Sequence, residues 1–327
     1  MSDFNLQAVR HSAPLRAPFT ISRGVKTAAE TVRVVINAGD AAGRGEGVPY
    51  ARYGESVESV LAQIEAVRSQ IESGASRADL IDLMAAGAAR CAVDCALWDL
   101  EAKQMGTPVW ERAGLPRPQP VATATTISLD TPEAMAAAAK AVEGRILKIK
   151  LGDDGALERV EAVRAARPEE KIIVDANEAA NPRELDVFAA AARALDVALI
   201  EQPLPAGEDQ ALAKHALPVA ICADESAHTA ADIEHLVKLY DVVNVKLDKT
   251  GGLTAALDMV HAARRAGMGV MVGCMVAGSL SMAPAVLLAQ LADVADLDGP
   301  LWLAEDVENG LNYSDGAVAP PTPALWG

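Results

Sequence analysis

The sequence predicts an α/β protein in which a (β/α) barrel follows a smaller α+β domain. Two observations predict this fold class: short apolar, β-branched runs recur through the second part of the chain, and five of them end in a charged residue at a nearly constant interval. These residues are Lys150, Asp175, Glu201, Asp224 and Lys246. Each interval has the length of one strand plus one returning helix, so the five residues are predicted to meet at the mouth of a barrel.

Two patterns ahead of the barrel indicate the α+β domain. Residues 31–36 and 43–48 alternate as a hairpin that turns near Gly39 and Asp40, and residues 57–71 and 81–103 have helical periodicity. The proline-rich stretch 114–120 marks a boundary, because proline neither continues a helix nor joins a central strand. The expected organisation is an α+β domain at 1–118, a barrel at 119–300, and a tail at 301–327 that packs back toward the first domain.

The predicted barrel strands are apolar until their last residues, as buried parallel strands are. They lie at 121–128, 146–150, 172–175, 197–201, 219–224, 242–246, 268–275 and, for the eighth unit, near 295–300. Alanine-rich, charge-bearing stretches between them, such as 157–166 and 184–195, are predicted helices. Residues 266–292 carry no charge and are long enough to span a bilayer. Their glycines, serines and Pro284 instead favour a strand, a loop and a helix start.

Composition excludes several classes of function. The formal net charge is −16, from 45 acidic and 29 basic residues, which argues against nucleic acid or an anionic membrane as partner. The four cysteines form no Cys-x-x-Cys pair or disulfide framework, and no secretory signal is apparent, so we expect a reducing cytoplasm. The five histidines form no His-x-His and end no predicted strand, which disfavours a zinc hydrolase.

Three of the strand-end residues are carboxylates. Asp175, Glu201 and Asp224 would repel one another at a barrel mouth unless a cation were bound, and an all-oxygen ligand set suits Mg²⁺. A single acid at a strand end is usually a helix cap or a loop residue. Three acids at barrel intervals, with lysines before and after, favour a metal site, and we predict one Mg²⁺ per subunit.

The flanking lysines indicate acid–base chemistry. Lys148 and Lys150 share one face of a strand, which is predicted to be the barrel interior, and Lys246 ends a strand on the opposite side. A free lysine has a pKa of about 10.4, so we expect neighbouring cations to depress the pKa of a lysine base. One lysine would remove the proton beside a carboxylate, Mg²⁺ would stabilise the enediolate, and the other lysine would return a proton to the opposite face. Lys148 receives a supporting role, because it could simply pair with a carboxylate.

Five motifs give the chain a family resemblance over essentially its whole length. They are Lys148-x-Lys150, Val174-Asp175-Ala176-Asn177, Ile200-Glu201-Gln202-Pro203, Ala223-Asp224-Glu225-Ser226, and Asn244-Val245-Lys246-Leu247 through Gly251-Gly252. The chain resembles the muconate-lactonizing subgroup of the enolase superfamily and, within it, the dipeptide epimerases that act on L-Ala-D/L-Glu. The resemblance implies a modified TIM barrel, (β/α)7β, with an N-terminal capping domain whose loops close over the barrel mouth. It also implies the roles of metal ligand for the three acids and of catalytic base for Lys150 and Lys246.

The same resemblance implies residues that bind the substrate. Asp296 and Asp298 match the Asp-x-Asp that grips the α-ammonium group of a dipeptide, and two carboxylates on one strand face do attract a free amino terminus. Residues 20–24 and 49–56 resemble the capping loops, where an arginine could pair bidentately with the glutamate side chain. Arg23 is the first choice and Arg52 the second. The alternative is that the two aspartates are ordinary loop charges and the two arginines are ordinary surface residues.

Asn177 and Glu225 sit beside predicted ligands, where they either orient the ligands or make ordinary loop hydrogen bonds. The predicted function is epimerisation of the glutamate α-carbon of L-Ala-D/L-Glu during recycling of cell-wall peptides. The partner is a small dipeptide, and a homo-oligomer is compatible with this reading. The alternatives are an N-acyl amino acid racemase, an o-succinylbenzoate synthase or a muconate cycloisomerase on the same scaffold, and a non-catalytic binding protein that kept the fold.

Overall fold

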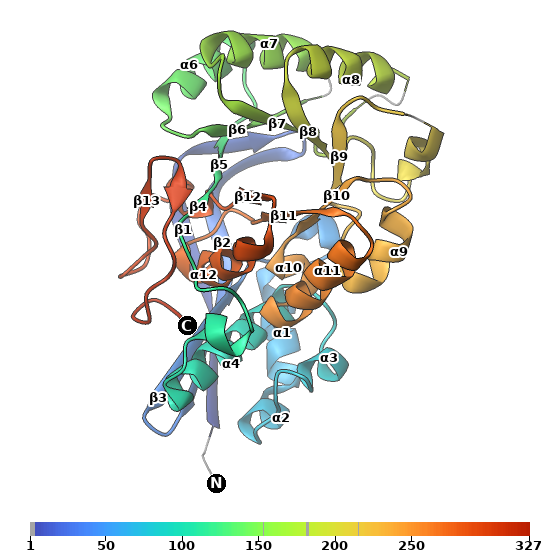
Figure 1. Ribbon diagram of the computed structural model, residues 1–327. Helices are drawn as coiled ribbons and strands as arrows, with labels where there is room; N and C mark the ends of the chain where they lie inside the picture. Colours follow the sequence, from blue (N-terminus) through green and yellow to red (C-terminus); the bar gives the residue numbers. More distant parts are fainter. Residues whose placement is uncertain (1–3, 153, 181–182, 215) are drawn as a thin grey trace.

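The barrel is an eight-stranded parallel sheet in a computed structural model that describes residues 4–152, 154–180, 183–214 and 216–327 (Figure 1). Hydrogen-bonded neighbours follow sequence order. The strands are β5 (Ala124–Ile127), β6 (Ile146–Lys150), β7 (Lys171–Asp175), β8 (Val197–Glu201), β9 (Ala220–Ala223), β10 (Val242–Val245), β11 (Gly269–Gly273) and β12 (Val294–Asp296). A parallel bridge between Thr123 and Ala295 joins the two edges, which closes the predicted barrel.

Helices follow the first seven strands, apart from a 3-10 segment after β8. They are α6 (Pro132–Ala141), α7 (Ala156–Ala166), α8 (Leu185–Ala194), η2 (Asp209–Lys214), α9 (Ile233–Leu236), α10 (Leu247–Thr250), α11 (Leu253–Arg265) and α12 (Ser279–Leu288). The eighth strand ends at Asp296, earlier than the predicted range near 295–300, and only the 3-10 segment η5 (Gly299–Trp302) follows it. This is the expected (β/α)7β pattern.

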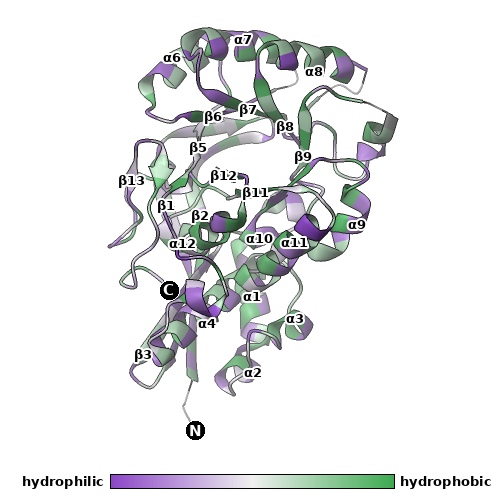
Figure 2. Cartoon of the chain, in the orientation of Figure 1, coloured by the Kyte–Doolittle hydropathy of each residue, from purple (hydrophilic) through white to green (hydrophobic). Residues whose placement is uncertain are grey.

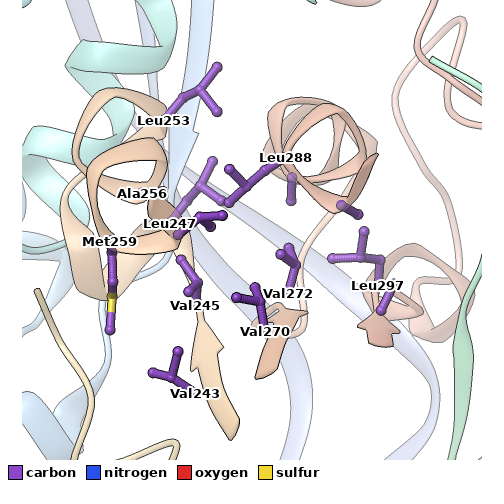
Figure 3. Close-up of a cluster of buried hydrophobic side chains, with 14 of the residues drawn as sticks. Val243, Val245, Leu247, Leu253, Ala256, Met259, Val270, Val272, Leu288 and Leu297 are labelled. Atoms are coloured by element: carbon purple, nitrogen blue, oxygen red, sulfur yellow. The ribbon is translucent and has the colours of Figure 1, made fainter. Parts of the chain in front are cut away.

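Alternation along the strands separates the helix-facing core from the barrel interior. Val243 and Val245 of β10 pack with Val270 and Val272 of β11 against the helices, as Figure 3 shows. The residues of opposite parity form a small interior cluster around Ile173, Leu199, Cys222 and Met271. In Figure 2, β7 and β8 are green over much of their length, whereas α7 carries both purple and green segments. The polar side chains that also face the barrel interior lie closer to the C-terminal ends of the strands than this apolar cluster does.

The N-terminal domain is a three-stranded antiparallel sheet covered by helices. Its strands are β1 (Phe4–Ile21), β2 (Gly24–Ala38) and β3 (Ala41–Gly47), and the predicted turn at Gly39 and Asp40 joins β2 to β3. The first strand was not predicted, because its sequence mixes polar residues with Pro14 and Pro18 and only every few residues are buried. Its long pairing with β2 carries the hairpin from the foot of the molecule to the barrel (Figure 1).

The helices of this domain correct two predicted ranges. Residues 57–71 form α1 (Val57–Ala66) and α2 (Arg68–Glu72) rather than one helix. The predicted helix 81–103 is also wrong as a single element: α3 (Leu80–Leu83) and α4 (Ala88–Met105) are separated by a bend. Gly87 has φ +146° there, a conformation that side-chain-bearing residues rarely adopt. The short helix α5 (Val109–Arg112) completes the domain.

The last residues of the chain contact α4. Trp326 donates its indole N–H to the carbonyl of Cys95, and the backbone N–H of Gly327 donates to Asp99. A small sheet of β4 (Val121–Ala122), β13 (Tyr313–Ser314) and β14 (Ala317–Val318) ties this segment to the barrel edge. The exact domain limits remain a prediction.

The uncharged stretch 266–292 holds β11, a loop and the ten-residue α12, and no helix in the described part of the chain is long and apolar enough to cross a bilayer. All four cysteines are free.

Candidate functional site

Strand register brings the predicted acids together. Lys150 of β6 pairs with Asp175 of β7, and Asp175 pairs with Glu201 of β8. Glu201 pairs with Cys222 of β9, so Asp224 follows two residues later on the same inward parity. All three carboxylates are buried. The regular intervals in the sequence therefore did predict neighbours at one end of the barrel.

Lys150 and Lys246 lie at opposite ends of this row of acids. The ammonium of Lys150 is 2.6 Å from Asp175 Oδ2, and that of Lys246 is 2.7 Å from Asp224 Oδ2. Four strand positions separate β6 from β10 in an eight-stranded barrel, which places the two lysines on opposite walls. This is the arrangement that two opposed bases need.

Lys148 is fully enclosed by acids. Its ammonium lies 2.7 Å from Glu201, 2.7 Å from Asp296 and 3.0 Å from Asp175. Burial alone lowers the pKa of Lys148, but the charges of these acids outweigh burial and hold the pKa well above its usual value. A permanently charged Lys148 fits the supporting role better than that of a base.

Asp224 has two ammonium partners. Besides Lys246, the buried Lys249 donates to Asp224 Oδ1 at 2.6 Å and to the carbonyl of Asn244 at 3.1 Å. Burial lowers the pKa of Lys246, yet the adjacent Asp224 raises it well above its usual value. The expected depression of a lysine pKa by neighbouring cations, Mg²⁺ included, stays a prediction, because the nearest charge to Lys246 in this arrangement is a carboxylate.

The donor set fits a divalent cation. Burial, with the charge of Asp175, raises the pKa of Glu201 to about 7, although the Lys148 ammonium lies 2.7 Å from its Oε2. Apart from this ion pair, Glu201 Oε2 has no hydrogen bond in the described part of the chain, and Asn177 Oδ1 is likewise buried without one. Among the described residues, no three potential ligands already converge as a metal cluster. A hard cation would add positive charge beside these three carboxylates.

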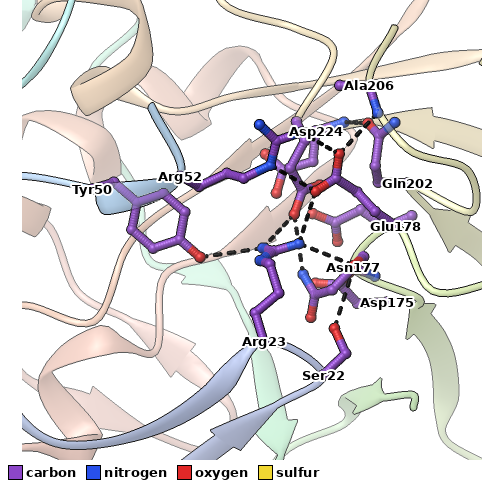
Figure 4. Close-up of polar contacts among 12 residues, drawn as sticks. Ser22, Arg23, Tyr50, Arg52, Asp175, Asn177, Glu178, Gln202, Ala206 and Asp224 are labelled. Carbon is purple, nitrogen blue, oxygen red and sulfur yellow. Dashed lines mark hydrogen bonds and ion pairs between the residues drawn. The ribbon is translucent and has the colours of Figure 1, made fainter. Parts of the chain in front are cut away.

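The two predicted arginines lie where the N-terminal domain meets the barrel (Figure 4). Arg23 donates to Glu225 at 2.6 Å, to Glu178 at 3.1 Å and to the carbonyl of Asn177 at 3.0 Å. Arg52 makes a bidentate pair with Glu178 at 2.7 and 2.9 Å. Both arginines thus bind carboxylates of the protein here, and their role toward a substrate remains a prediction.

A cavity of about 60 Å³ separates the N-terminal loops from the barrel mouth. The barrel contributes both proposed bases, Lys150 and Lys246, with Asp224 and Glu225. The N-terminal domain contributes the side chains that roof it, namely Phe19, Ile21, Arg23, Lys26, Tyr50 and Tyr53. This volume holds about two water molecules, so a dipeptide can enter only if the roof moves.

Asp296 and Asp298 lie across the barrel from the cation site of β7 to β9. Asp296 Oδ1 is buried without a hydrogen bond, while Oδ2 binds Lys148. Asp298 accepts the backbone N–H of Thr126 at 2.7 Å, and burial, with the charge of Asp296, raises its pKa to about 6. Asp298 also lines a separate cavity of about 730 Å³ beside α6 and β13. Binding of an ammonium group by this pair remains a prediction.

The sequence predicted only some of the residues that contact the three acids or lie beside them. Asn177 donates its backbone N–H to Asp175 Oδ1 at 3.0 Å, while its side-chain amide lies 3.4 Å from Glu225. Asn244 donates to Glu201 Oε1 at 2.7 Å and was missed, although it stands two residues before Lys246 and so shares its inward face. Lys249 and Lys26 were also missed. Lys249 lies beyond the strand, and no strand had been predicted at Lys26.

Comparison with known proteins agrees with this geometry. Residues 133–324 match the family described as enolase C-terminal domain-like, and residues 4–114 match the N-terminal domain of mandelate racemase / muconate lactonizing enzyme. The chain is 44% identical to the L-Ala-D/L-Glu epimerase of Escherichia coli, over 93% of this chain and 96% of that protein. It is also 44% identical to an N-acetyl-D-glutamate racemase of Pseudoalteromonas, over 90% of this chain and 94% of that protein.

A crystal structure of an enolase family member from Agrobacterium tumefaciens, with homology to dipeptide epimerases, superposes with a TM-score of 0.97 at 51% identity. The match covers 99% of this chain and all of that one, which was solved with bound sodium and L-Ala-L-Glu. The two-domain fold, the row of acids and these relatives together place the chain in the enolase superfamily, in the mandelate racemase / muconate lactonizing group, as an isomerase.

Proposed function

We propose that the protein epimerises the glutamate α-carbon of L-Ala-D/L-Glu by moving protons through two lysines. The observation that carries the proposal is that Lys150 and Lys246 reach one enclosed cavity from opposite walls of the barrel. A carbon held between them exposes one face to each amine. The relatives that act on L-Ala-D/L-Glu support the choice of substrate.

The lysines need complementary protonation states. A neutral lysine accepts the α-proton on one face while the C–H electron pair passes into the carboxylate, which becomes an enediolate. The opposite lysine, as an ammonium, donates a proton to the other face, and the electron pair returns to form the new C–H bond. The product has the inverted configuration, and solvent exchange restores both lysines. The two lysines exchange roles when the opposite epimer is the substrate.

One Mg²⁺, held by Asp175, Glu201 and Asp224, would supply charge stabilisation to the substrate carboxylate as the α-proton leaves. Lys148 holds Glu201, Asp175 and Asp296 together by its three short contacts. Asp296 and Asp298 are the proposed partners of the α-ammonium group, because Asp296 keeps a buried oxygen free of hydrogen bonds. Arg23 and, further out, Arg52 are proposed to attract the side-chain carboxylate, and Asn177 and Glu225 to orient the ligands and the roof.

Incubation of L-Ala-D-Glu with the protein and Mg²⁺ in D₂O tests the reaction. The expected NMR result is inversion together with deuterium at the glutamate α-carbon, and absence of both would remove the assignment. Lys246→Ala should abolish inversion yet leave α-proton exchange in one epimer, the L-Glu one, through Lys150. Lys238→Ala, on the exposed surface, is the matched control and should behave as wild type.

N-acetyl-glutamate racemisation is the second candidate, because a relative with that activity is equally similar. The two substrates share the glutamate centre but differ in the ammonium group that Asp296 and Asp298 would bind. Asp296→Asn should therefore lower kcat/KM for the dipeptide more than for N-acetyl-glutamate. A role in recycling of cell-wall peptides predicts that cells without the protein accumulate L-Ala-D-Glu.

A further inference from the structure

Lys26 is a cation in the roof of the catalytic cavity that nothing described so far uses. It is the third residue of β2, pairs with Phe19 of β1, and lines the same cavity as Lys150 and Lys246. Its neighbour Val25 is 60% exposed, as expected for the opposite face of a strand, whereas Lys26 is half-buried. The hairpin therefore aims this one ammonium group at the barrel.

Lys26 lacks the acidic partner that its neighbours have. Arg23 binds Glu225, Lys150 binds Asp175 and Lys246 binds Asp224, at 2.6, 2.6 and 2.7 Å. Within the described parts of the chain, the ammonium group of Lys26 has no ion pair or hydrogen bond. Its ammonium rests 4.8 Å from the ring centre of Tyr50, a cation–π contact that leaves its N–H donors free. A half-buried lysine without a carboxylate partner keeps its N–H donors available to an anion that enters the cavity.

The electrostatic surroundings of Lys26 favour an anion. Burial lowers the pKa of Lys26, and the nearby charges of Lys246, Lys150 and Arg23 lower it further. Arg23 and Lys26 on the roof and Lys150 and Lys246 on the barrel side surround the cavity, so a carboxylate placed beside Lys26 would be attracted by several cations at once. Arg23 is less available, because its two terminal nitrogens already bind two carboxylates, a carbonyl and the Tyr50 hydroxyl.

We propose that Lys26, beside the arginines that attract the side-chain carboxylate of the substrate's glutamate residue, binds this carboxylate directly and thereby selects acidic over neutral dipeptides. The inference rests on the proposed function and assigns surroundings to each charged group of the dipeptide. The α-carboxylate faces the acids and cation of the barrel, the ammonium group faces Asp296 and Asp298, and the distal carboxylate faces the roof. Lys26 acts as a specificity-determining residue on the moving domain, so an acidic side chain also helps to hold the roof closed.

The test compares L-Ala-L-Glu with its neutral isostere L-Ala-L-Gln as substrates of the full-length, Mg²⁺-loaded protein. Lys26→Met keeps the length of the side chain and removes the charge. It should raise KM for the Glu dipeptide about 10- to 100-fold, the value of a charge-assisted hydrogen bond, with little change in kcat. The Gln dipeptide should be nearly unaffected, so the Glu-to-Gln preference falls by the same factor. Lys26→Arg should restore most of the Glu-to-Gln preference. Lys140→Met, on the exposed face of α6, should leave kcat and KM for both dipeptides unchanged.

Two outcomes would overturn the inference. An unchanged Glu-to-Gln preference in Lys26→Met means that another group reads the side chain. Equal losses for both substrates that Lys26→Arg does not reverse mean that Lys26 only supports the roof. A wild-type protein that turns over neither dipeptide would instead refute the proposed function, and this inference with it, so the two failures are distinguishable.

Discussion

Arg23, at the tip of the β1–β2 hairpin, donates a 2.6 Å hydrogen bond to Glu225, which follows β9 at the barrel mouth. The pair joins the two domains beside the cavity that Lys150 and Lys246 line. Burial, with the charges of Asp224 and Asp175, raises the pKa of Glu225, whereas Lys246 and Arg23 favour its ionised form. The closed roof is therefore held by charge as well as by packing.

Arg23→Met should loosen this roof in the absence of substrate. We expect amide hydrogen exchange in residues 19–26 to become about tenfold faster, because a half-exposed partner of a buried acid contributes on the order of 1 kcal/mol. Mass spectrometry of deuterium uptake measures this directly. Arg52→Met is the control, since Arg52 bonds to Glu178 and, among the residues that the structure describes, not to the hairpin. Equal uptake in wild type and Arg23→Met would show that the pair does not hold the roof.

A glycine face on β3 fixes how closely α4 packs on the N-terminal sheet. A Cβ atom would lie 2.1, 2.0 and 2.2 Å from a backbone oxygen of α4 at Gly43, Gly45 and Gly47, respectively. The oxygens belong to Ala96, Ala92 and Ala88, one helical turn apart. Because backbone cannot rotate away as a side chain can, Gly45→Ala should destabilise the fold by about 3 kcal/mol or more.

Urea unfolding measures this loss. Gly152→Ala is the control, because its new methyl group would meet only the flexible Leu129 side chain at 3.3 Å. It should cost less than about 1 kcal/mol. If Gly45→Ala unfolds at the same urea concentration as wild type, the helix has room to move and this account of the packing is wrong.

The barrel was predictable because its signals are local and periodic. Each acid closes an apolar run, and a period of two fixes which side chains face inward, so Asp175, Glu201 and Asp224 could be placed together before any coordinates. The N-terminal domain was harder. The strand β1, which contains two prolines, is held by long-range pairing with β2, and the break at Gly87 depends on one backbone conformation. Lys26 was missed for the same reason, since its place over the cavity follows from that pairing.

Asn244 is predicted to set the affinity for the metal through Glu201. Its amide donates to Glu201 Oε1 at 2.7 Å, while Lys148 lies 2.7 Å from Oε2, and the amide bond fixes the orientation of the carboxylate. Asn244→Leu has a similar size but no donor, so Glu201 should lose its fixed orientation. We expect Mg²⁺ to bind about 10- to 100-fold more weakly, the usual effect of losing a partner of a ligand. Titration calorimetry with Mg²⁺ alone measures this without turnover. Asn312→Leu, on the surface, should bind as wild type does, and an unchanged affinity in Asn244→Leu would contradict the role.

Asp94 is predicted to make the domain interface sensitive to pH. This buried residue of α4 accepts two hydrogen bonds from Thr254 of α11, at 2.5 Å from the hydroxyl and 3.0 Å from the backbone N–H. Burial outweighs these bonds and raises the pKa of Asp94 to about 6, from an ordinary value of 3.8. Between these values the folded protein keeps a proton that the unfolded chain has lost. Stability from this group is therefore lost as pH rises from about 4 to about 6, by up to ~3 kcal/mol.

Asp94→Asn removes the ionisable carboxyl group, so the difference in stability between the variant and wild type reports the titration of Asp94 alone. The free energy of unfolding of the variant minus that of wild type should rise by up to ~3 kcal/mol between pH 4 and pH 7, whatever its value at pH 4. Urea unfolding at several pH values gives this difference. Thr254→Val removes the hydroxyl donor that lowers the pKa of Asp94, so its own stability should fall over a window that reaches to higher pH. A difference between Asp94→Asn and wild type that stays constant with pH would mean that Asp94 ionises in the folded protein as readily as in the unfolded chain.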